Sequence, residues 1–256
     1  MKSLEVQLRA LRDAKRTALV PYFMGGVTSD WTKHVEAAVH AGADAVEIGI
    51  PFSDPMMDGV VIQEAAMRAL AAGTTFDSIC ADLEQLDASV PLIAMTYYNV
   101  FHHYGIQRSV GRLEGSGIRG AIVPDLALEE SDEWVVACDQ HDVATIFLVA
   151  PSTPPERVRA IGTATQGFAY ASGRMAVTGK SNGESDARRV VGSVRSVTSV
   201  PTYIGIGITN DVQAREAAEI GDGVIVGSAL VQIILDGGGP HEIERFIGSF
   251  RIALDS

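Results

Sequence analysis

Hydrophobic positions along this chain fall into two kinds of segment. Short runs rich in valine, isoleucine and aromatic residues have the pattern of buried strands, and the longer stretches that follow have the pattern of amphipathic helices. The strands expected from these runs are Leu19–Phe23, Ala45–Ile50, Leu92–Tyr97, Gly120–Val123, Thr145–Val149, Gly167–Tyr170, Thr202–Ile204 and Gly223–Val226. A helical pattern follows nearly all of them, which is typical of an α/β fold.

Eight strand and helix units are the number that closes a (β/α)8 barrel, also called a TIM barrel. The competing architecture is an open doubly wound sheet, but such sheets usually have fewer strands and a GxGxxG motif after the first one, which this chain lacks. No linker or low-complexity run divides the sequence. We therefore expect residues 1–256 to form one (β/α)8 barrel domain with an extra helix at the N-terminus, and any chemistry to lie where strands run into their following loops.

Composition narrows the kinds of partner and site. The chain has 32 acidic and 20 basic residues and a net charge of −12, which argues against nucleic acid or an anionic membrane as a partner. It has neither a membrane-spanning apolar run nor a signal peptide pattern, so we expect a cytoplasmic location. The two cysteines, Cys80 and Cys138, lie far apart without zinc-ligand spacing, so we expect reduced thiols and no metal site.

A carboxylate is predicted inside the barrel. Within the expected strand Ala45–Ile50, a period of two places Val46, Ile48 and Ile50 on one face and Glu47 on the other. The apolar face should pack against the helices, which directs Glu47 inward. Burial raises the pKa of a carboxyl group, and a raised pKa suits a general acid or base near neutral pH. The alternative is a structural glutamate with a buried partner.

Three aspartates follow expected strands, and each has an ordinary structural interpretation. Asp54 is flanked by serine and proline, as in a turn, and Asp58 precedes a helix expected over Val60–Ala71, which it could cap. Asp125 follows the fourth strand and could cap the next helix or belong to a site. From the residues alone, the structural interpretation is favoured for Asp54 and Asp58.

Glycine-rich sequences follow the last two expected strands. Gly205-Ile-Gly207 comes after the seventh, and Gly227-Ser228 opens a short helix after the eighth. In barrels these loops usually bind phosphate, because glycines let backbone amides approach the anion and the helix dipole favours negative charge. The long polar loop after the sixth strand has the length and glycine content of a lid.

One string in the sequence is highly specific: Glu47-Ile-Gly-Ile-Pro-Phe-Ser-Asp-Pro-Met-Met-Asp58-Gly, followed by Ile62-Gln63. Further segments are Tyr97-Tyr-Asn99, Val123-Pro-Asp125, Arg174 with Val177-Thr-Gly179, Gly205-Ile-Gly207 and Gly227-Ser228. In this order and spacing, and over the whole chain, they closely resemble the tryptophan synthase alpha subunit family.

The resemblance implies a lyase of tryptophan biosynthesis without a cofactor of its own, which cleaves indole-3-glycerol phosphate to indole and glyceraldehyde 3-phosphate by retro-aldol chemistry. The family's acid/base glutamate falls on Glu47. Its aspartate for the indole N–H falls on Asp58, which replaces the capping interpretation, and Tyr170 aligns with a tyrosine near the glutamate. The implied phosphate donors are Gly179, Gly207, Gly227 and Ser228. The implied indole pocket comprises Tyr22, Met95, Ile122, Leu148, Thr178, Ile206 and Ile225.

By the same resemblance, the expected partner is a beta subunit that carries pyridoxal phosphate, in a heterotetramer of two alpha and two beta chains, with Asp54 at the interface. Two alternatives stay open: a stand-alone lyase that releases free indole, and a catalytically silent, alpha-like allosteric subunit. The chain departs from the family pattern mainly in loops, at Met24, Met57, Val60, Val100, Ala127, Gly173 and Ala176.

Overall fold

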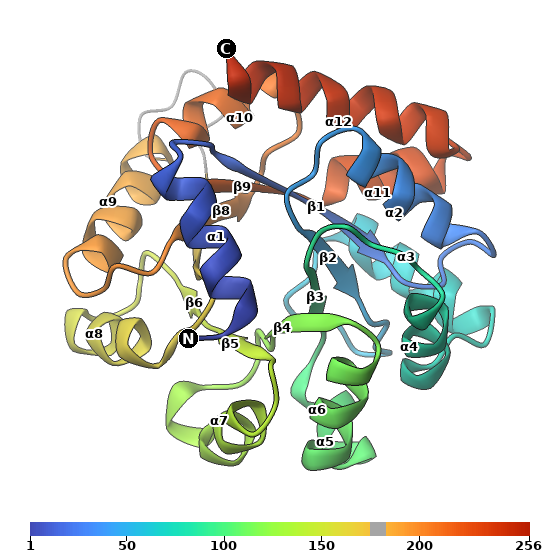
Figure 1. Cartoon of the computed structure of the whole chain (residues 1–256), viewed down its shortest axis with the longest axis horizontal. Coiled ribbons are helices and arrows are strands. Elements are labelled where there is room, and N and C mark those ends of the chain that lie inside the picture. The colour runs from blue at the N-terminus through green and yellow to red at the C-terminus, as the bar shows by residue number, and fades with distance from the viewer. Residues whose placement is uncertain (175–182) are drawn as a thin grey trace.

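The computed structural model describes residues 1–174 and 183–256, and its strands form one parallel sheet curled into a barrel (Figure 1). The strands are β1 Ala18–Met24, β2 Val46–Gly49, β3 Leu92–Met95, β4 Ile118–Ile122, β5 Ala144–Ile146, β6 Leu148–Val149, β7 Ala169–Arg174, β8 Thr202–Ile206 and β9 Gly223–Val226. They lie in the order β5-β4-β3-β2-β1-β9-β8-β7-β6. Because Phe147 alone separates β5 from β6, the fifth expected strand is split in two, and the two ends of the sheet meet through one residue.

Helices surround this sheet, and their sequence order gives the alternation that the hydrophobic pattern predicted (Figure 1). They are α1 Ser3–Asp13, α2 Trp31–His40, α3 Val60–Ala71, α4 Phe76–Glu84, α5 Tyr98–Tyr104, α6 Ile106–Gly115, the 3-10 helix η1 Leu128–Glu130, α7 Asp132–Asp139, α8 Pro155–Ala164, α9 Gly183–Arg195, α10 Asp211–Ala218, α11 Ser228–Leu235 and α12 Pro240–Asp255. The predicted (β/α)8 barrel is confirmed, with α1 as the extra N-terminal helix and α11 as the short helix after the last strand.

Two apolar layers stabilise the barrel. Val46 and Ile48 belong to the large cluster between strands and helices, as the alternation in β2 predicted. A second cluster fills the barrel interior and includes Ile93, Ile122 and Phe168, all with no exposed surface. Burying a side chain of this size contributes about 1.5–3 kcal/mol, so both layers add substantially to the stability of the fold.

Helix α1 closes the amino-terminal end of the barrel. In Figure 1 it crosses in front of the strands, and its Leu4 and Leu8 are fully buried in the interior cluster. Leu4 packs so closely against β4 that a Cβ atom on Gly120 would lie 2.5 Å from Leu4 Cδ2. Glycine at position 120 therefore makes the room into which Leu4 inserts.

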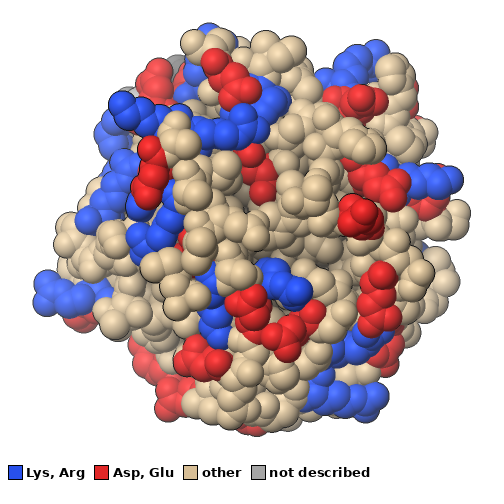
Figure 2. All heavy atoms as spheres, in the orientation of Figure 1, with Lys and Arg blue, Asp and Glu red and all other residues tan. Residues whose placement is uncertain are grey.

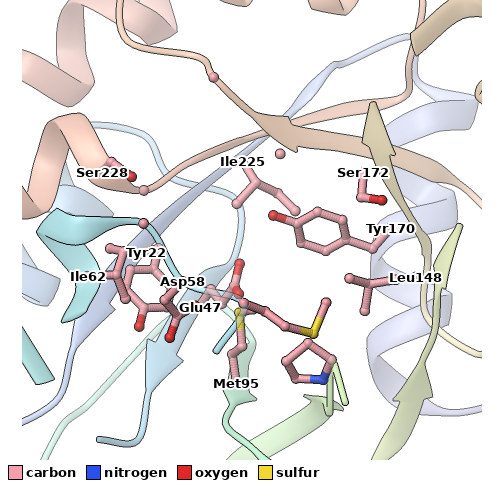
Figure 3. Close-up of a pocket in the computed structure, with 16 residues that line it drawn as sticks. Tyr22, Glu47, Asp58, Ile62, Met95, Leu148, Tyr170, Ser172, Ile225 and Ser228 are labelled. Carbon is pink, nitrogen blue, oxygen red and sulfur yellow. The ribbon is translucent and has the colours of Figure 1, made fainter. Parts of the chain in front are cut away.

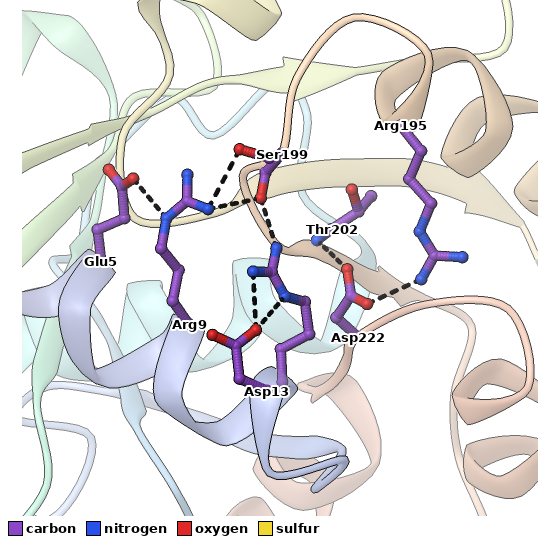
Figure 4. Close-up of polar contacts among 8 residues, drawn as sticks. Glu5, Arg9, Asp13, Arg195, Ser199, Thr202 and Asp222 are labelled. Atoms are coloured by element: carbon purple, nitrogen blue, oxygen red, sulfur yellow. Dashed lines mark hydrogen bonds and ion pairs between the residues drawn. The ribbon is translucent and has the colours of Figure 1, made fainter.

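Polar contacts fasten α1 to this end of the barrel (Figure 4). Arg9 donates hydrogen bonds to Glu5 Oε1 and to the backbone oxygen of Ser199, both at 2.8 Å. Nearby, Asp222 accepts from the backbone amide of Thr202 and from Arg195, also at 2.8 Å. Such contacts at the amino-terminal end of a barrel serve stability, which leaves the opposite end for chemistry.

The Leu4→Ala variant is expected to lower the free energy of unfolding by about 2–5 kcal/mol, because truncation leaves a cavity in a closed layer. Val6→Ala on the same helix is the control, since Val6 is 53% exposed and an exposed substitution changes stability by about 0.5 kcal/mol or less. Urea unfolding followed by circular dichroism measures both. Equal stabilities of the two variants would contradict the conclusion that α1 closes this end of the barrel through buried apolar contacts.

Charged side chains of both signs are mixed on one face of the barrel. Figure 2 shows lysine and arginine side chains interspersed with aspartate and glutamate on the face that carries α1. Within the described residues, no helix is both long enough and apolar enough to cross a membrane. Cys80 and Cys138 are buried and unpaired.

Candidate active site

A cavity of about 430 Å³ lies at the carboxyl ends of the strands (Figure 3). Most residues that the sequence analysis assigned to a site line it, namely Tyr22, Glu47, Asp58, Met95, Leu148, Tyr170, Gly207, Ile225, Gly227 and Ser228. They come from strands and loops spread along the whole chain, and the barrel topology brings them together. This end of the barrel, opposite α1, is where barrel enzymes place their chemistry.

Glu47 lies on β2 beside Tyr22 of β1, its register partner, and only 1% of its surface is exposed. Neither carboxylate oxygen has a hydrogen-bond partner among the described residues. Burial, with a smaller contribution from the nearby charge of Asp58, raises the pKa of Glu47 to about 8. The side chain is therefore protonated at neutral pH, which makes it a proton donor.

Asp58 lies between β2 and α3 and is half-buried. The N-cap residue of α3 is Gly59, with no side-chain cap, so the capping interpretation of Asp58 was wrong. The Asp58 backbone oxygen instead accepts a hydrogen bond from Gln63 Nε2 at 2.8 Å. Burial raises the pKa of Asp58, and a hydrogen bond from Tyr97 opposes that rise. The two carboxyl groups thus lie near each other in different environments, an arrangement suited to a division of acid and base roles.

Two buried tyrosines, Tyr22 and Tyr170, also line the cavity, and the hydroxyl of each occupies space left by a glycine on the neighbouring strand. A Cβ atom on Gly49 would lie 1.9 Å from Tyr22 Oη, and one on Gly205 would lie 2.0 Å from Tyr170 Oη. Burial raises the pKa of both tyrosines well above 10. Both hydroxyls therefore stay protonated and can act as hydrogen-bond donors.

Another part of the cavity wall has features of an anion site. Gly207 has a φ of +81°, which favours glycine, and a Cβ atom there would meet no other atom within 4 Å. Gly227 is the N-cap residue of α11, and Ser228 is its first residue. The first amides of a helix lack intrahelical acceptors, so they are available to an anion.

The remaining predicted residues are Ile122, Asp54, Thr178, Gly179 and Ile206. Ile122 is fully buried in the interior cluster and is not among the residues that line the cavity. Asp54 is exposed and accepts a hydrogen bond from Ser53 Oγ at 2.6 Å. Thr178 and Gly179 lie outside the described residues, as does the side chain of Ile206.

Asp125 has a role that the sequence analysis did not anticipate. Its Oδ1 accepts a hydrogen bond at 2.8 Å from the backbone amide of Tyr98, the first residue of α5. It therefore serves the helix of the preceding unit rather than the helix after its own strand. Within the described residues, no group of three or more histidine, cysteine or acidic side chains is placed to hold a metal ion.

The cavity wall also contains Gly205, from the predicted phosphate loop, and residues without a predicted role in the site: Met57, Gly59, Ile62, Pro124 and Ser172. Ser172 follows Tyr170 by two positions on β7, so its inward direction follows from the strand period. Met57 and Pro124 adjoin Asp58 and Asp125 in the strings already noted. Proximity in sequence to those aspartates was the signal that could have identified them.

Comparisons with known proteins point to one family. The model of the tryptophan synthase alpha chain family matches residues 8–245. The alpha chain of Thermobifida fusca is 42% identical over 243 residues, which cover 91% of this chain and 90% of that protein. The alpha chain of Picosynechococcus is 38% identical and covers 99% of this chain and 100% of its own length.

Solved structures show the same relationship. A ligand-free tryptophan synthase chain from M. tuberculosis aligns with a TM-score of 0.91 and 32% identity, covering 100% of both chains. The alpha subunit from Legionella pneumophila aligns with a TM-score of 0.90 and 30% identity, covering 100% of this chain and 99% of that one. From sequence and fold together, this chain belongs to the tryptophan synthase alpha chain family.

Proposed function

We propose that Glu47 and Asp58 divide the acid and base work of the family's reaction. As a member of this family, the chain is a lyase of tryptophan biosynthesis that cleaves indole-3-glycerol phosphate into indole and glyceraldehyde 3-phosphate. The comparisons do not favour the stand-alone lyase or the silent subunit. The observation that carries the residue assignment is that Glu47 is buried in one cavity with the half-buried Asp58, and that its carboxylate oxygens have no hydrogen-bond partner among the described residues.

The reaction breaks the bond between indole C3 and the glycerol chain. Glu47, protonated at neutral pH, donates its proton to C3, and the ring nitrogen becomes positively charged. Asp58 accepts a hydrogen bond from the ring N–H and stabilises this charge. Loss of the proton from the adjacent hydroxyl turns that oxygen into the aldehyde oxygen while the electrons of the C–C bond return to the ring. The carboxylate that Glu47 has become is available to take that proton.

Substrate binding follows the polarity of the cavity. We assign binding of the indole ring to the apolar side chains of Met95, Leu148 and Ile225, which line the cavity. We assign the phosphate to the backbone and hydroxyl donors of Gly207, Gly227 and Ser228 at the start of α11. Thr178 and Gly179 join these groups in the proposal on the basis of the family resemblance. Tyr170 would orient Glu47, since it lies close enough that a negative charge on Glu47 would raise the pKa of the Tyr170 hydroxyl.

The partner in this proposal is a tryptophan synthase beta subunit, contacted through the exposed Asp54, in a heterotetramer of two alpha and two beta chains. Pyridoxal phosphate would belong to that subunit, because the steps proposed for this chain use its own side chains alone. The shared name of the relatives, alpha chain, supports membership in a larger enzyme. A cytoplasmic location is part of the same proposal.

Indole release from indole-3-glycerol phosphate tests the proposal. The purified chain is assayed alone and with a beta subunit from the same source, with Glu47→Gln as the blank. We expect turnover by the chain and a marked increase when the partner is added. Fast turnover without a response to the partner would support a stand-alone lyase, and no turnover in either condition would rule out the proposed chemistry.

A further inference from the structure

Tyr97 holds the loop that carries Asp58. It lies just after β3, is the N-cap residue of α5 and is 4% exposed. Its hydroxyl accepts a hydrogen bond from the backbone amide of Met57 at 2.8 Å. Its ring stacks on Phe52, with centroids 5.3 Å apart and planes at 29°. One side chain from the next barrel unit therefore contacts the loop both near its start and directly beside Asp58.

The Tyr97 hydroxyl also acts on the Asp58 side chain, because as a hydrogen-bond donor to the carboxylate it lowers the pKa of Asp58. A phenol oxygen can accept one hydrogen bond and donate its own proton in another, so the contacts with Met57 and Asp58 are compatible. Burial raises the pKa of Tyr97 to about 12. The hydroxyl therefore keeps its proton at any pH at which the reaction would be measured.

The backbone around Tyr97 is fixed on both sides. The preceding residue, Thr96, is buried and donates a hydrogen bond from Oγ1 to the backbone oxygen of Ile50, the residue just after β2, at 2.9 Å. The following residue, Tyr98, donates its amide hydrogen to Asp125, beyond β4. Three consecutive units of the barrel thus meet around Tyr97, so its hydroxyl is held in place before any substrate binds.

We propose that Tyr97 is a positioning residue for Asp58, which keeps the Asp58 carboxylate at the cavity wall where the indole N–H is to be bound. The inference rests on the proposed function, because it assumes that Asp58 interacts with the ring nitrogen. Tyr97 itself is absent from the wall of the main cavity, whereas Asp58 is part of it. Its effect on the reaction therefore passes through Asp58.

Loss of the Tyr97 hydroxyl should change the pKa of Asp58 in a direction that can be measured. The titratable groups near Asp58 are Glu47 on β2, Tyr22 on β1, Tyr170 on β7 and Tyr97 itself. Burial raises the pKa of Asp58 and the Tyr97 hydrogen bond lowers it. Removing the hydroxyl leaves the effect of burial unopposed, so Asp58 would become protonated at a higher pH than in the wild type.

The Tyr97→Phe variant keeps the ring and removes the hydroxyl. In the full chain, we expect kcat/KM for indole-3-glycerol phosphate to fall about 10–100-fold, which corresponds to the loss of one hydrogen bond to a charged group. The acidic limb of the pH profile should move to higher pH. Tyr98→Phe is the matched control, since the Tyr98 ring packs against His102 of the same helix, and this variant should keep the wild-type rate and profile.

A second arm places Tyr97→Phe in an Asp58→Asn background, where the effect of removing the hydroxyl should largely disappear. Wild-type rate and pH profile in Tyr97→Phe would overturn the inference. A lower rate with an unmoved acidic limb, or an undiminished effect in the Asp58→Asn background, would also overturn it, because Tyr97 would then act only on the fold. An inactive wild-type chain would instead refute the proposed function.

Discussion

The Glu47→Gln variant is expected to lose indole release by about 10²–10⁴-fold in kcat, the usual contribution of one positioned proton donor. Glutamine has nearly the same shape, but its amide does not deliver a proton to indole C3. Because Glu47 is 1% exposed and its oxygens have no partner among the described residues, the substitution breaks no hydrogen bond seen in the structure. Steady-state kinetics on the folded variant measures the loss.

The pH dependence of the wild type adds a second readout for the same residue. With the pKa of Glu47 at about 8, the protonated donor dominates below that pH. Activity should therefore fall as pH rises through 8, and the residual activity of Glu47→Gln should lack this alkaline limb. Glu47→Asp is the matched variant, since it keeps a carboxyl group and should keep an alkaline limb at a reduced rate.

The stability of the folded state should also depend on the protonation of Glu47. The folded state holds the Glu47 proton more tightly than the unfolded chain, whose carboxyl pKa is near 4.5. The stabilising contribution of that bound proton is fully present below pH 4.5 and is lost as pH rises to about 8. As the pH rises from 5 to 8, Glu47→Gln should therefore become more stable to heat relative to the wild type.

The kinetic predictions for Glu47 have a clear contrary outcome. A wild-type rate of indole release in Glu47→Gln, with an unchanged alkaline limb, would assign the proton donor to another residue.

The sequence predicted the burial of Glu47 because the relevant rule is local. Alternation within β2 places Val46 and Ile48 toward the helices and Glu47 inward, and the structure confirms each of these directions. The same rule could not place Ile122. Met95 and Ile122 are register partners on β3 and β4, yet only Met95 lines the cavity. Alternation predicts which side of a strand faces inward, whereas depth along the barrel axis depends on the stagger of all strands.

The local sequence pattern gave the wrong role for Asp58 for a related reason. An aspartate just before a helix is ordinarily a cap, and the family resemblance, not the local pattern, corrected this interpretation. In the structure, a hydroxyl 40 positions away in sequence bonds the amide of Met57, and Gly59 becomes the N-cap residue of α3. Asp125 likewise serves a helix of another unit. Loop contacts between units of a barrel depend on the closed fold, so they leave no local pattern in the sequence.

The Asp58→Asn variant is expected to lower kcat/KM for indole-3-glycerol phosphate by about 10²–10³-fold, the usual cost of losing one group that stabilises developing charge. Asparagine keeps the size of the side chain but removes the negative charge that faces the ring nitrogen. The loss should fall mainly on kcat, because the positive charge on the nitrogen grows only as C3 takes its proton.

The control for this variant is Asp54→Asn in the isolated chain, which removes the same charge from an exposed position of the same loop. The two variants should also differ in their pH profiles. The pKa of Asp58 is raised by burial, so activity of the wild type should fall on the acidic side as this carboxylate takes up a proton. Asp54→Asn should keep that limb, and Asp58→Asn should lose it. If both variants kept the wild-type rate and the acidic limb, the ring N–H would need an acceptor other than Asp58, and the division of roles between the two carboxylates would be wrong.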